Sequence, residues 1–217
     1  MKKYILSIIL VFAGIVSEAQ GIRFSFMANP QLTWFSGTDE NYQANGSFPG
    51  INIGLELDAF FTENYAFSTG ISLNNIRGGA IYDDILVYRL GETDKILEPG
   101  SRMTYGLQYI TVPLGLKFKT IEIGYSTYWL NTGLSPMFLI RSRVSDETDT
   151  FSKTDFIDET RFYNMNYFIE GGIEYSLGGN TAFIAGIGYH SGFFDVTKNS
   201  SYRLTTQGFS LILGILF

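Results

Sequence analysis

The sequence predicts an all-β fold in which eight antiparallel strands close into an up-and-down transmembrane β-barrel. Three observations predict it. Eight segments alternate apolar or aromatic residues with small or polar ones, as strands with one apolar face require. Long connections between these segments alternate with short ones. Gly, Tyr and Phe are abundant, at 24, 14 and 19 of 217 residues, a composition typical of many strands separated by turns.

Residues 1–19 are predicted to be a signal peptide. Lys2 and Lys3 provide a positive start, residues 4–16 form an uncharged and mostly apolar run, and the small residues Ser17 and Ala19 suit a cleavage site. The apolar run is shorter than the ~20 residues that a transmembrane helix needs. We therefore expect cleavage after Ala19 and a single exported barrel domain over residues 20–217.

The eight strands are assigned from the alternation. In chain order they span residues 22–34, 49–61, 64–77, 103–118, 127–141, 161–177, 181–192 and 203–217. The clearest is 161–177, where Tyr163 and Tyr167 share one face while Asn164 and Glu170 lie on the other. Each strand is long enough to cross a membrane at a tilt, for which ~9–11 residues suffice.

The connections indicate which end of the barrel faces outward. The long connections are 35–48, 78–102, 142–160 and 193–202, and the short ones are 62–63, 119–126 and 178–180. Outer-membrane barrels have short periplasmic turns and long external loops, so both chain ends are expected on the periplasmic side. The second long connection contains IYDDILVYRL, whose alternation suggests that strands three and four continue as a hairpin above the membrane.

Two places are expected to be irregular. Around 119–126, Ile121 and Ile123 alternate in one parity whereas Tyr128 alternates in the other, so we interpret this connection as a bulge or an extended turn. Pro113 lies inside a predicted strand and removes a donor from the hydrogen-bond ladder. A local irregularity should therefore accompany Pro113.

Polarity distinguishes a membrane barrel from a soluble one, in which the apolar face points inward. Here the continuous Leu, Ile, Tyr and Phe face would overfill an eight-strand lumen, whereas the small and polar face fits inside it. The apolar face is therefore expected to contact lipid, where closure of the barrel satisfies every backbone group. The interfacial aromatic girdles are expected to include Trp34, Tyr65, Tyr105, Tyr128, Trp129, Tyr163 and Tyr175.

The inward face carries charged residues. The predicted lumen set comprises Arg23, Glu56, Asp58, Lys117, Glu170 and Glu174. An eight-stranded barrel is only wide enough for its own side chains, and buried charges must be paired or solvated. Two interpretations stay open: a network of salt bridges and hydrogen bonds that plugs the barrel, or groups that face trapped water.

Three stretches of the sequence carry a recognisable pattern. The first is YITVPLGLKFKT, with Tyr109, Pro113, Lys117 and Phe118. The second, WLNTGLSPMFLI, contains the residues 133–136, and the third is the terminal FSLILGILF. Together they resemble an outer-membrane β-barrel family that includes the PorT-like proteins. The resemblance spans the chain after the signal peptide and implies an eight-stranded barrel in the outer membrane of a Gram-negative cell. It does not imply one particular activity.

Several function classes are excluded or disfavoured. The chain has no cysteine and a formal net charge of −6, so a disulfide framework is impossible and a nucleic-acid partner is not expected. No metal or cofactor is predicted, because metal-spaced His clusters and phosphate-cradling Gly loops are missing and the pair Asp83-Asp84 lacks a Ca²⁺-loop pattern. His190 and Ser191 are adjacent on a strand and point to opposite faces, so they make a poor base and nucleophile. We expect no enzyme activity, with a lipid-modifying enzyme as the less favoured alternative.

Arginines fall at strand ends that this topology places on the outside. They are Arg77, Arg102, Arg141, Arg143, Arg161 and Arg203. Such a collar could bind lipopolysaccharide phosphates through its guanidinium forks. The alternative is that the arginines snorkel and anchor the strand ends without any specific lipid.

The terminal strand has an outward face made of Phe209, Leu211, Leu213, Ile215 and Phe217. It must pair with the first strand to close the sheet. Its alternation and terminal aromatic residue resemble the signal that the barrel-assembly machinery recognises. We therefore expect this machinery as a partner during biogenesis.

The expected role is structural or interactive. A monomeric barrel, embedded in outer-membrane lipid, would anchor the connections 35–48, 78–102 and 142–160 as a contact surface for an envelope protein. Porin-like passage of small solutes is the second function class, and lipid hydrolysis is the third.

Overall fold

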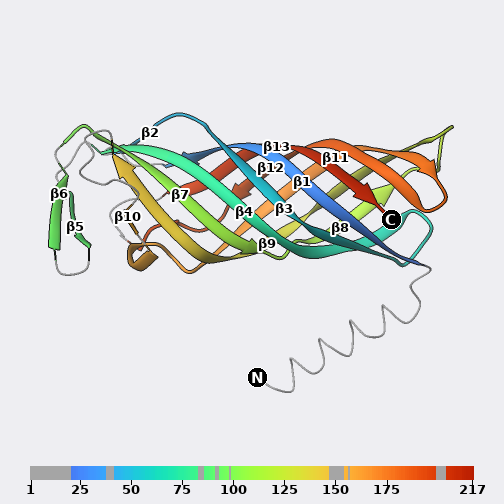
Figure 1. The fold of residues 1–217 in the computed structure, drawn as a ribbon, viewed down its shortest axis with the longest axis horizontal. Coiled ribbons are helices and arrows are strands. Elements are labelled where there is room, and N and C mark those ends of the chain that lie inside the picture. The colour runs from blue at the N-terminus through green and yellow to red at the C-terminus, as the bar shows by residue number, and fades with distance from the viewer. Residues whose placement is uncertain are drawn as a thin grey trace, which may run out of the picture.

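In the computed structural model, the described residues are 21–37, 42–82, 86–90, 93–97, 99–146, 154–155, 157–198 and 204–217. They form an antiparallel β-barrel whose strands run obliquely along one long axis (Figure 1). The predicted signal peptide and Arg203 lie outside the described residues. Within the described part of the chain, no helix is both long and apolar enough to span a membrane.

Eight barrel strands form the ring, and one of them consists of two segments. They are β1 (Gly21–Ser36), β3 (Phe48–Phe60), β4 (Tyr65–Tyr82), the pair β7 (Ser101–Thr111) and β8 (Leu114–Lys119), β9 (Ser126–Asp146), β11 (Tyr163–Gly178), β12 (Thr181–Gly192) and β13 (Thr205–Leu216). Shorter elements are β2 (Tyr42–Ala44), β5 (Leu86–Leu90), β6 (Thr93–Leu97), β10 (Thr154–Asp155) and the 3₁₀ turn η1 (Ile157–Glu159). The predicted eight-stranded fold is confirmed.

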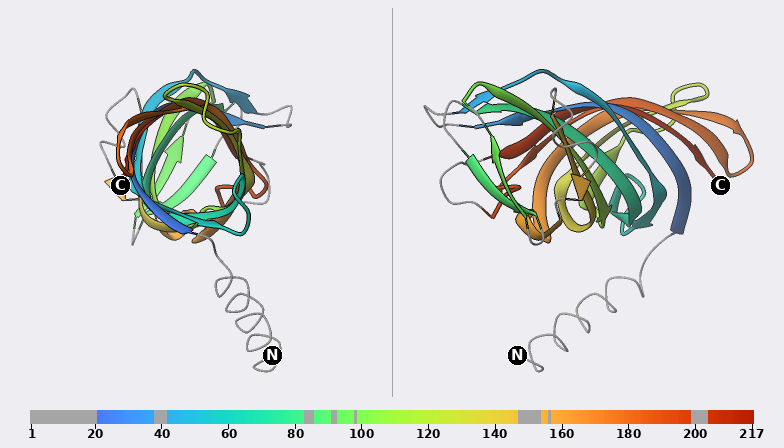
Figure 2. Two further views of the ribbon diagram at one scale, coloured as in Figure 1. Left: turned by 90° about the vertical axis from the view of Figure 1, so that its right-hand side faces the viewer. Right: turned by 60° about the vertical axis from the view of Figure 1, so that its left-hand side comes forward.

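The barrel closes between its first and last strands. β13 pairs with β12 on one side and with β1 on the other, from Ser25 opposite Leu216 to Ser36 opposite Thr205. Figure 2 shows the resulting ring in its left-hand view. The short turns and Phe217 lie at one end (Figure 1), which is the periplasmic end in outer-membrane barrels. We call the opposite end, where the long connections lie, the outer end.

The barrel strand formed by β7 and β8 is interrupted at Pro113, as predicted. Neither Val112 nor Pro113 belongs to a strand, and the Val112 N–H donates to the Pro136 carbonyl oxygen at 3.0 Å. The connection after β8 is an extended turn, in which Ile123 bridges to Ser126 around Gly124, whose φ is +69°. A glycine suits this left-handed conformation because it has no Cβ.

Strands three and four of the barrel extend beyond the predicted ends. β4 continues to Tyr82, which pairs with Ser101 at the start of β7. Between them, β5 and β6 pair as a separate two-stranded sheet. The sequence therefore predicted the extension of the hairpin but not its division into two sheets.

The exposed apolar side chains of the strands form a belt around the barrel, which we call the apolar belt. On the β4, β7 and β9 side this belt ends at a single row of residues. Leu73, Ile110 and Phe138 form one outward row across these strands, and Asn75, Gln108 and Arg141 form the next row toward the outer end. A bulge in β9 skips Ile140 between the two rows. Beyond this boundary the polarity of the strands is inverted, because apolar side chains point inward and polar ones outward.

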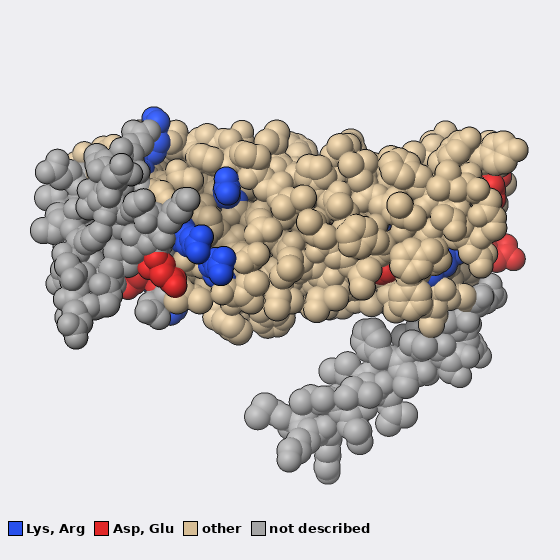
Figure 3. All heavy atoms as spheres, in the orientation of Figure 1, with Lys and Arg blue, Asp and Glu red and all other residues tan. Residues whose placement is uncertain are grey.

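Aromatic rings form a continuous outer girdle on the other side of the barrel. Successive ring centroids are 5.1 to 6.2 Å apart along the series Trp34, Phe209, Tyr189, Tyr167 and Phe193. Such belts mark the membrane–water interface. On the face shown in Figure 3, a middle zone almost free of charged side chains lies between the two ends.

The girdle prediction was wrong for two residues. Tyr105 and Trp129 are only 1% and 6% exposed and belong to clusters inside the barrel. Odd-numbered residues of β7 and of this part of β9 face the lumen. Parity along the strand therefore decided the direction of these side chains, whereas closeness to a strand end did not.

Candidate functional site

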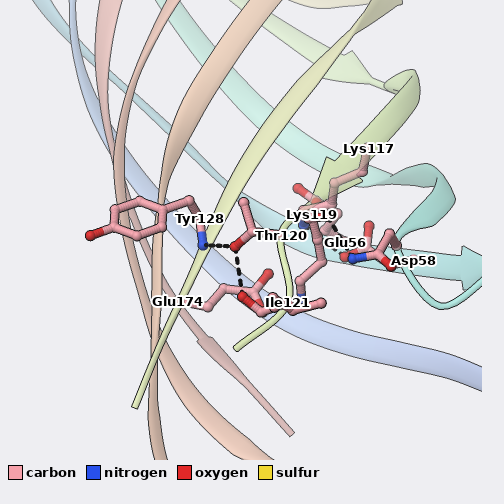
Figure 4. Close-up of polar contacts among 9 residues, drawn as sticks. Glu56, Asp58, Lys117, Lys119, Thr120, Ile121, Tyr128 and Glu174 are labelled. Atoms are coloured by element: carbon pink, nitrogen blue, oxygen red, sulfur yellow. Dashed lines mark hydrogen bonds and ion pairs between the residues drawn. The ribbon is translucent and has the colours of Figure 1, made fainter. Parts of the chain in front are cut away.

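The periplasmic end of the lumen holds a buried group of charges, which we call the inner ion-pair cluster: Glu56, Asp58, Lys117, Lys119 and Glu174. Lys117 Nζ, from β8, lies 2.9 Å from Glu56 Oε1 and 2.7 Å from Asp58 Oδ2, both on β3 (Figure 4). β4 lies between β8 and β3 in the sheet, so these contacts pass over a strand inside the barrel. Ser68 on β4 also donates to Glu56 Oε1 at 3.0 Å.

A second ion pair completes this cluster. Lys119 contacts the Glu174 carboxylate on β11, and both side chains are buried. Phe60 lies beside it, with Lys119 Nζ 5.4 Å and the Arg23 guanidinium carbon 5.3 Å from the ring centre. These distances suit cation–π interactions. Side chains from β1, β3, β8 and β11 thus meet across this end of the lumen.

The structure brings together some of the predicted lumen residues. Glu56, Asp58 and Lys117 are in direct contact, and Glu174 pairs instead with Lys119, which the sequence reasoning missed. The available signal was the stretch KFK, in which Lys119 shares the inward parity of Lys117. Arg23 is exposed at the mouth of the barrel and forms no ion pair within the described part of the chain.

The middle of the lumen contains a polar cavity of about 80 Å³. Its lining includes five asparagines, which are Asn29, Asn52, Asn74, Asn131 and Asn166, together with Glu56 and Glu170. Gln31 Nε2 donates to Asn74 Oδ1 at 2.8 Å, from β1 to β4 across β3. The buried oxygens of Asn52, Asn131 and Thr111 have no hydrogen-bond partner among the described residues, and such groups are suited to binding buried water.

The outer half of the lumen is filled by a cluster that the sequence reasoning did not predict. This outer apolar cluster comprises Phe35, Ile76, Ala80, Met103, Tyr105, Leu107, Tyr109, Met137, Leu139, Val144, Val196 and Leu204. Phe35 reaches from β1 over Gly78 of β4, and its ring centre is 5.7 Å from that of Tyr105 on β7. The available signal was the inverted polarity of residues 102–109.

His190 and Ser191 lie on opposite faces of β12. His190 lines the central cavity, and its Nε2 has no hydrogen-bond partner among the described residues. Ser191 pairs in register with Tyr167 and Gln207, which belong to the outward rows. Residues of the described ranges also include no group of three or more His, Asp or Glu placed to hold a metal ion.

Five of the six predicted arginines can be placed. Arg77, Arg102, Arg141 and Arg143 are exposed residues of β4, β7 and β9 toward the outer end. Arg161 is exposed before β11, and its Nε donates to the Thr197 carbonyl oxygen at 2.9 Å. The strand arginines therefore lie on one side of the barrel and do not form an even collar.

The terminal strand has the predicted parity. Phe209, Leu211, Ile215 and Phe217 are exposed, Leu213 is half-buried, and Ile212 and Leu216 are buried. The Phe217 N–H donates to the Phe24 carbonyl oxygen at 2.9 Å, which continues the seam to the end of the strand. Recognition of this strand by the assembly machinery remains a prediction.

Comparison with solved structures finds surface and outer-membrane proteins that align over most of both chains. Neisserial surface protein A (NspA) is 14% identical, with 91% of this chain and 98% of that chain covered and a TM-score of 0.48. OprG from Pseudomonas aeruginosa is 10% identical, with coverage of 90% and 94% and a TM-score of 0.47. Ail, the attachment invasion locus protein of Yersinia pestis, is 10% identical, with coverage of 90% and 99% and a TM-score of 0.38. At these identities the likeness concerns the fold alone.

No curated protein matches the chain. A family model described as "Outer membrane protein beta-barrel domain" matches residues 17–198, which is most of the chain. The closed antiparallel ring and the exposed apolar side chains agree with that description. The chain therefore belongs to the outer membrane protein β-barrel domain family and is a protein of the outer membrane.

Proposed function

We propose that this barrel is a membrane anchor with a closed lumen, whose outer connections make contact with an envelope protein. The observation that carries the proposal is the filled lumen. The inner ion-pair cluster occupies the periplasmic end, and the outer apolar cluster occupies the outer half. Function is then expected on the surfaces that the barrel presents, because described side chains fill both ends of the lumen.

Passage of small solutes is the second candidate, and the central cavity is the observation that favours it. At about 80 Å³, that cavity holds a few water molecules. A conducting path would require both the ion-paired side chains and the apolar side chains to move aside. The filled ends therefore favour an anchor over a pore.

Single-channel recording tests the closed lumen. Purified protein inserted into a planar bilayer is expected to give no large, steady conductance, because both ends of the lumen are filled. Insertion is verified in the same preparation by heat-modifiable migration on a gel. Large and steady openings from folded, inserted protein would contradict the anchor and favour the pore.

The connection between β4 and β7 is the part of the contact surface that can be removed most cleanly. Tyr82 and Ser101 are paired, so residues 83–100 can be replaced by Asn-Gly, a two-residue hairpin turn. Crosslinking in intact cells is expected to capture an envelope protein with the wild type and to lose that product with the shortened variant. An insertion in the periplasmic turn at Gly179 is the control. Equal crosslinking by wild type and the shortened variant would contradict a role for this connection.

We also infer that the protein is not a lipid-modifying enzyme. Support comes from the placement of His190 in the lumen and of Ser191 in an outward row, which keeps a base away from a hydroxyl nucleophile.

Within the family, we infer a relation to the PorT-like proteins. It is supported by the strand interrupted at Pro113 and by the residues 133–136 paired with β11.

A further inference from the structure

Outward side chains on β4, β7 and β9 form a polar patch directly beyond the apolar belt. We call it the arginine patch: Asn75, Arg77, Gly106, Gln108, Arg141 and Arg143. Two rows cross the three strands, one made of Asn75, Gln108 and Arg141 and the other of Arg77, Gly106 and Arg143. These residues line a groove of about 790 Å³ on the outside of the barrel.

Gly106 makes the centre of the patch open. A Cβ added at this position would have only the Arg143 carbonyl oxygen near it, at 4.0 Å. Arg77 and Arg143 flank Gly106 on the neighbouring strands, so their Cα atoms are about 10 Å apart. Two guanidinium groups can therefore converge over a gap that no side chain of the described residues fills.

The height of the arginine patch matches the head groups of the outer leaflet. The last apolar row is Leu73, Ile110 and Phe138, and each further row lies two residues, or about 6.6 Å of strand, away. With the usual tilt of ~40°, Arg141 lies about 5 Å and Arg143 about 10 Å above that row. The head-group region begins at the edge of the hydrocarbon and is several ångströms thick.

The patch differs from a collar of anchoring arginines. At the outer interface, the β1, β11, β12 and β13 side carries the aromatic girdle. The exposed strand arginines of the described ranges near this end, including Arg102, all lie on β4, β7 and β9. Anchoring by snorkelling alone does not explain why these arginines are concentrated on one side of the barrel.

Among the described residues, the three arginines of the patch outnumber the one carboxylate that is their register neighbour. Asp155 on β10 is the register neighbour of Arg143. Its Oδ1 accepts a hydrogen bond from the Ile157 N–H at 3.2 Å, so this carboxylate also binds the first residue of the turn η1. No ion pair joins Arg77, Arg141 or Arg143 to a carboxylate within the described parts of the chain.

We propose that the arginine patch binds the phosphate groups of a lipid of the outer leaflet, a phosphorylated lipid of the lipid A class, with one phosphate seated over Gly106. Arg77 and Arg143 supply bidentate guanidinium donors from its two sides, and a planar fork matches the oxygens of a phosphate. Arg141 and Gln108 provide further donors one row closer to the membrane. The acyl chains of the same lipid then lie against the apolar row of Leu73, Ile110 and Phe138.

The test measures binding of diphosphorylated lipid A to the purified full-length barrel in mixed micelles. Two variants alter the site in different ways. Arg77→Gln/Arg143→Gln removes the two guanidinium charges, and Gly106→Phe fills the gap between the two arginines while both arginines stay. Each is expected to weaken binding by at least about tenfold, because charge-assisted hydrogen bonds are lost. Arg23→Gln removes one arginine charge at the periplasmic end and is expected to leave binding unchanged.

Three further outcomes decide the proposal. Dephosphorylated lipid A is expected to bind equally weakly to wild type and to both variants. Unchanged affinity of the folded double variant for diphosphorylated lipid A would overturn the proposal in favour of plain anchoring. Competition by millimolar inorganic phosphate would overturn the lipid assignment and leave a site for free phosphate. Heat-modifiable migration verifies folding of each variant, and none of these results bears on the outer connections.

Discussion

Replacing Lys117 by Met is expected to destabilise the folded barrel by about 3–5 kcal/mol. Among the described residues, Lys117 is the one cation in contact with both Glu56 and Asp58, at 2.9 and 2.7 Å, and its side chain is 2% exposed. Its removal leaves the buried Asp58 carboxylate and the largely buried Glu56 carboxylate without a counter-charge among the described residues. The measurement is equilibrium unfolding in urea of the protein in lipid vesicles, followed by heat-modifiable migration and by tryptophan fluorescence.

Two controls separate the loss of charge from the loss of packing. The triple variant Lys117→Met/Glu56→Gln/Asp58→Asn is expected to recover most of the stability, because it leaves no buried charge unpaired. Lys119→Met is expected to cost less than Lys117→Met, since it frees only the Glu174 carboxylate. If Lys117→Met unfolds at the wild-type midpoint, the inner ion-pair cluster contributes little to stability.

The sequence was sufficient to predict the eight strands and, where their outer face is apolar, the face that most side chains occupy. In a barrel whose outside is lipid, a period of two is enforced along every strand, and the alternation of Ile51, Ile53 and Leu55 with Asn52 and Gly54 reports it directly. Pro113 could likewise be flagged because its missing N–H is a local property.

The partners inside the lumen could not be predicted in the same way. Lys117 contacts Asp58 over β4, and Lys119 contacts Glu174 over β9, so each choice depends on the stagger between strands around the whole ring. Parity shows that these residues point inward, but it does not show at which height they meet.

The inverted polarity of β7 is visible in the sequence. From Met103 to Tyr109 the apolar residues have odd numbers, whereas from Ile110 to Phe118 the outward apolar residues have even numbers. The switch marks the height at which lipid gives way to head groups and solvent. Both the outer apolar cluster and the arginine patch begin at this level.

Replacing Gly186 by Val is expected to destabilise the barrel by about 3 kcal/mol, the upper part of the usual range for overpacking. Trp129, Gly172 and Gly186 form one inward row across β9, β11 and β12. A Cβ on Gly186 would lie 2.9 Å from Trp129 Cζ2 and 2.5 Å from the Gly171 carbonyl oxygen. Urea unfolding in vesicles measures the loss.

Gly106→Val is the matched control, because the same substitution on an outward and open position of β7 meets only one atom, at 4.0 Å. Valine favours strands and has less backbone freedom than glycine in the unfolded chain, so this variant is expected to be neutral or slightly stabilised. Adding Trp129→Ala to Gly186→Val should restore only part of the stability, since the contact with the Gly171 carbonyl oxygen remains. Equal stability of Gly186→Val and Gly106→Val would show that the indole does not lie against the glycine row. If Gly186→Val destabilises the barrel and Gly106→Val does not, the lumen beside Trp129 is closely packed, whereas the outer groove at Gly106 has room for a side chain.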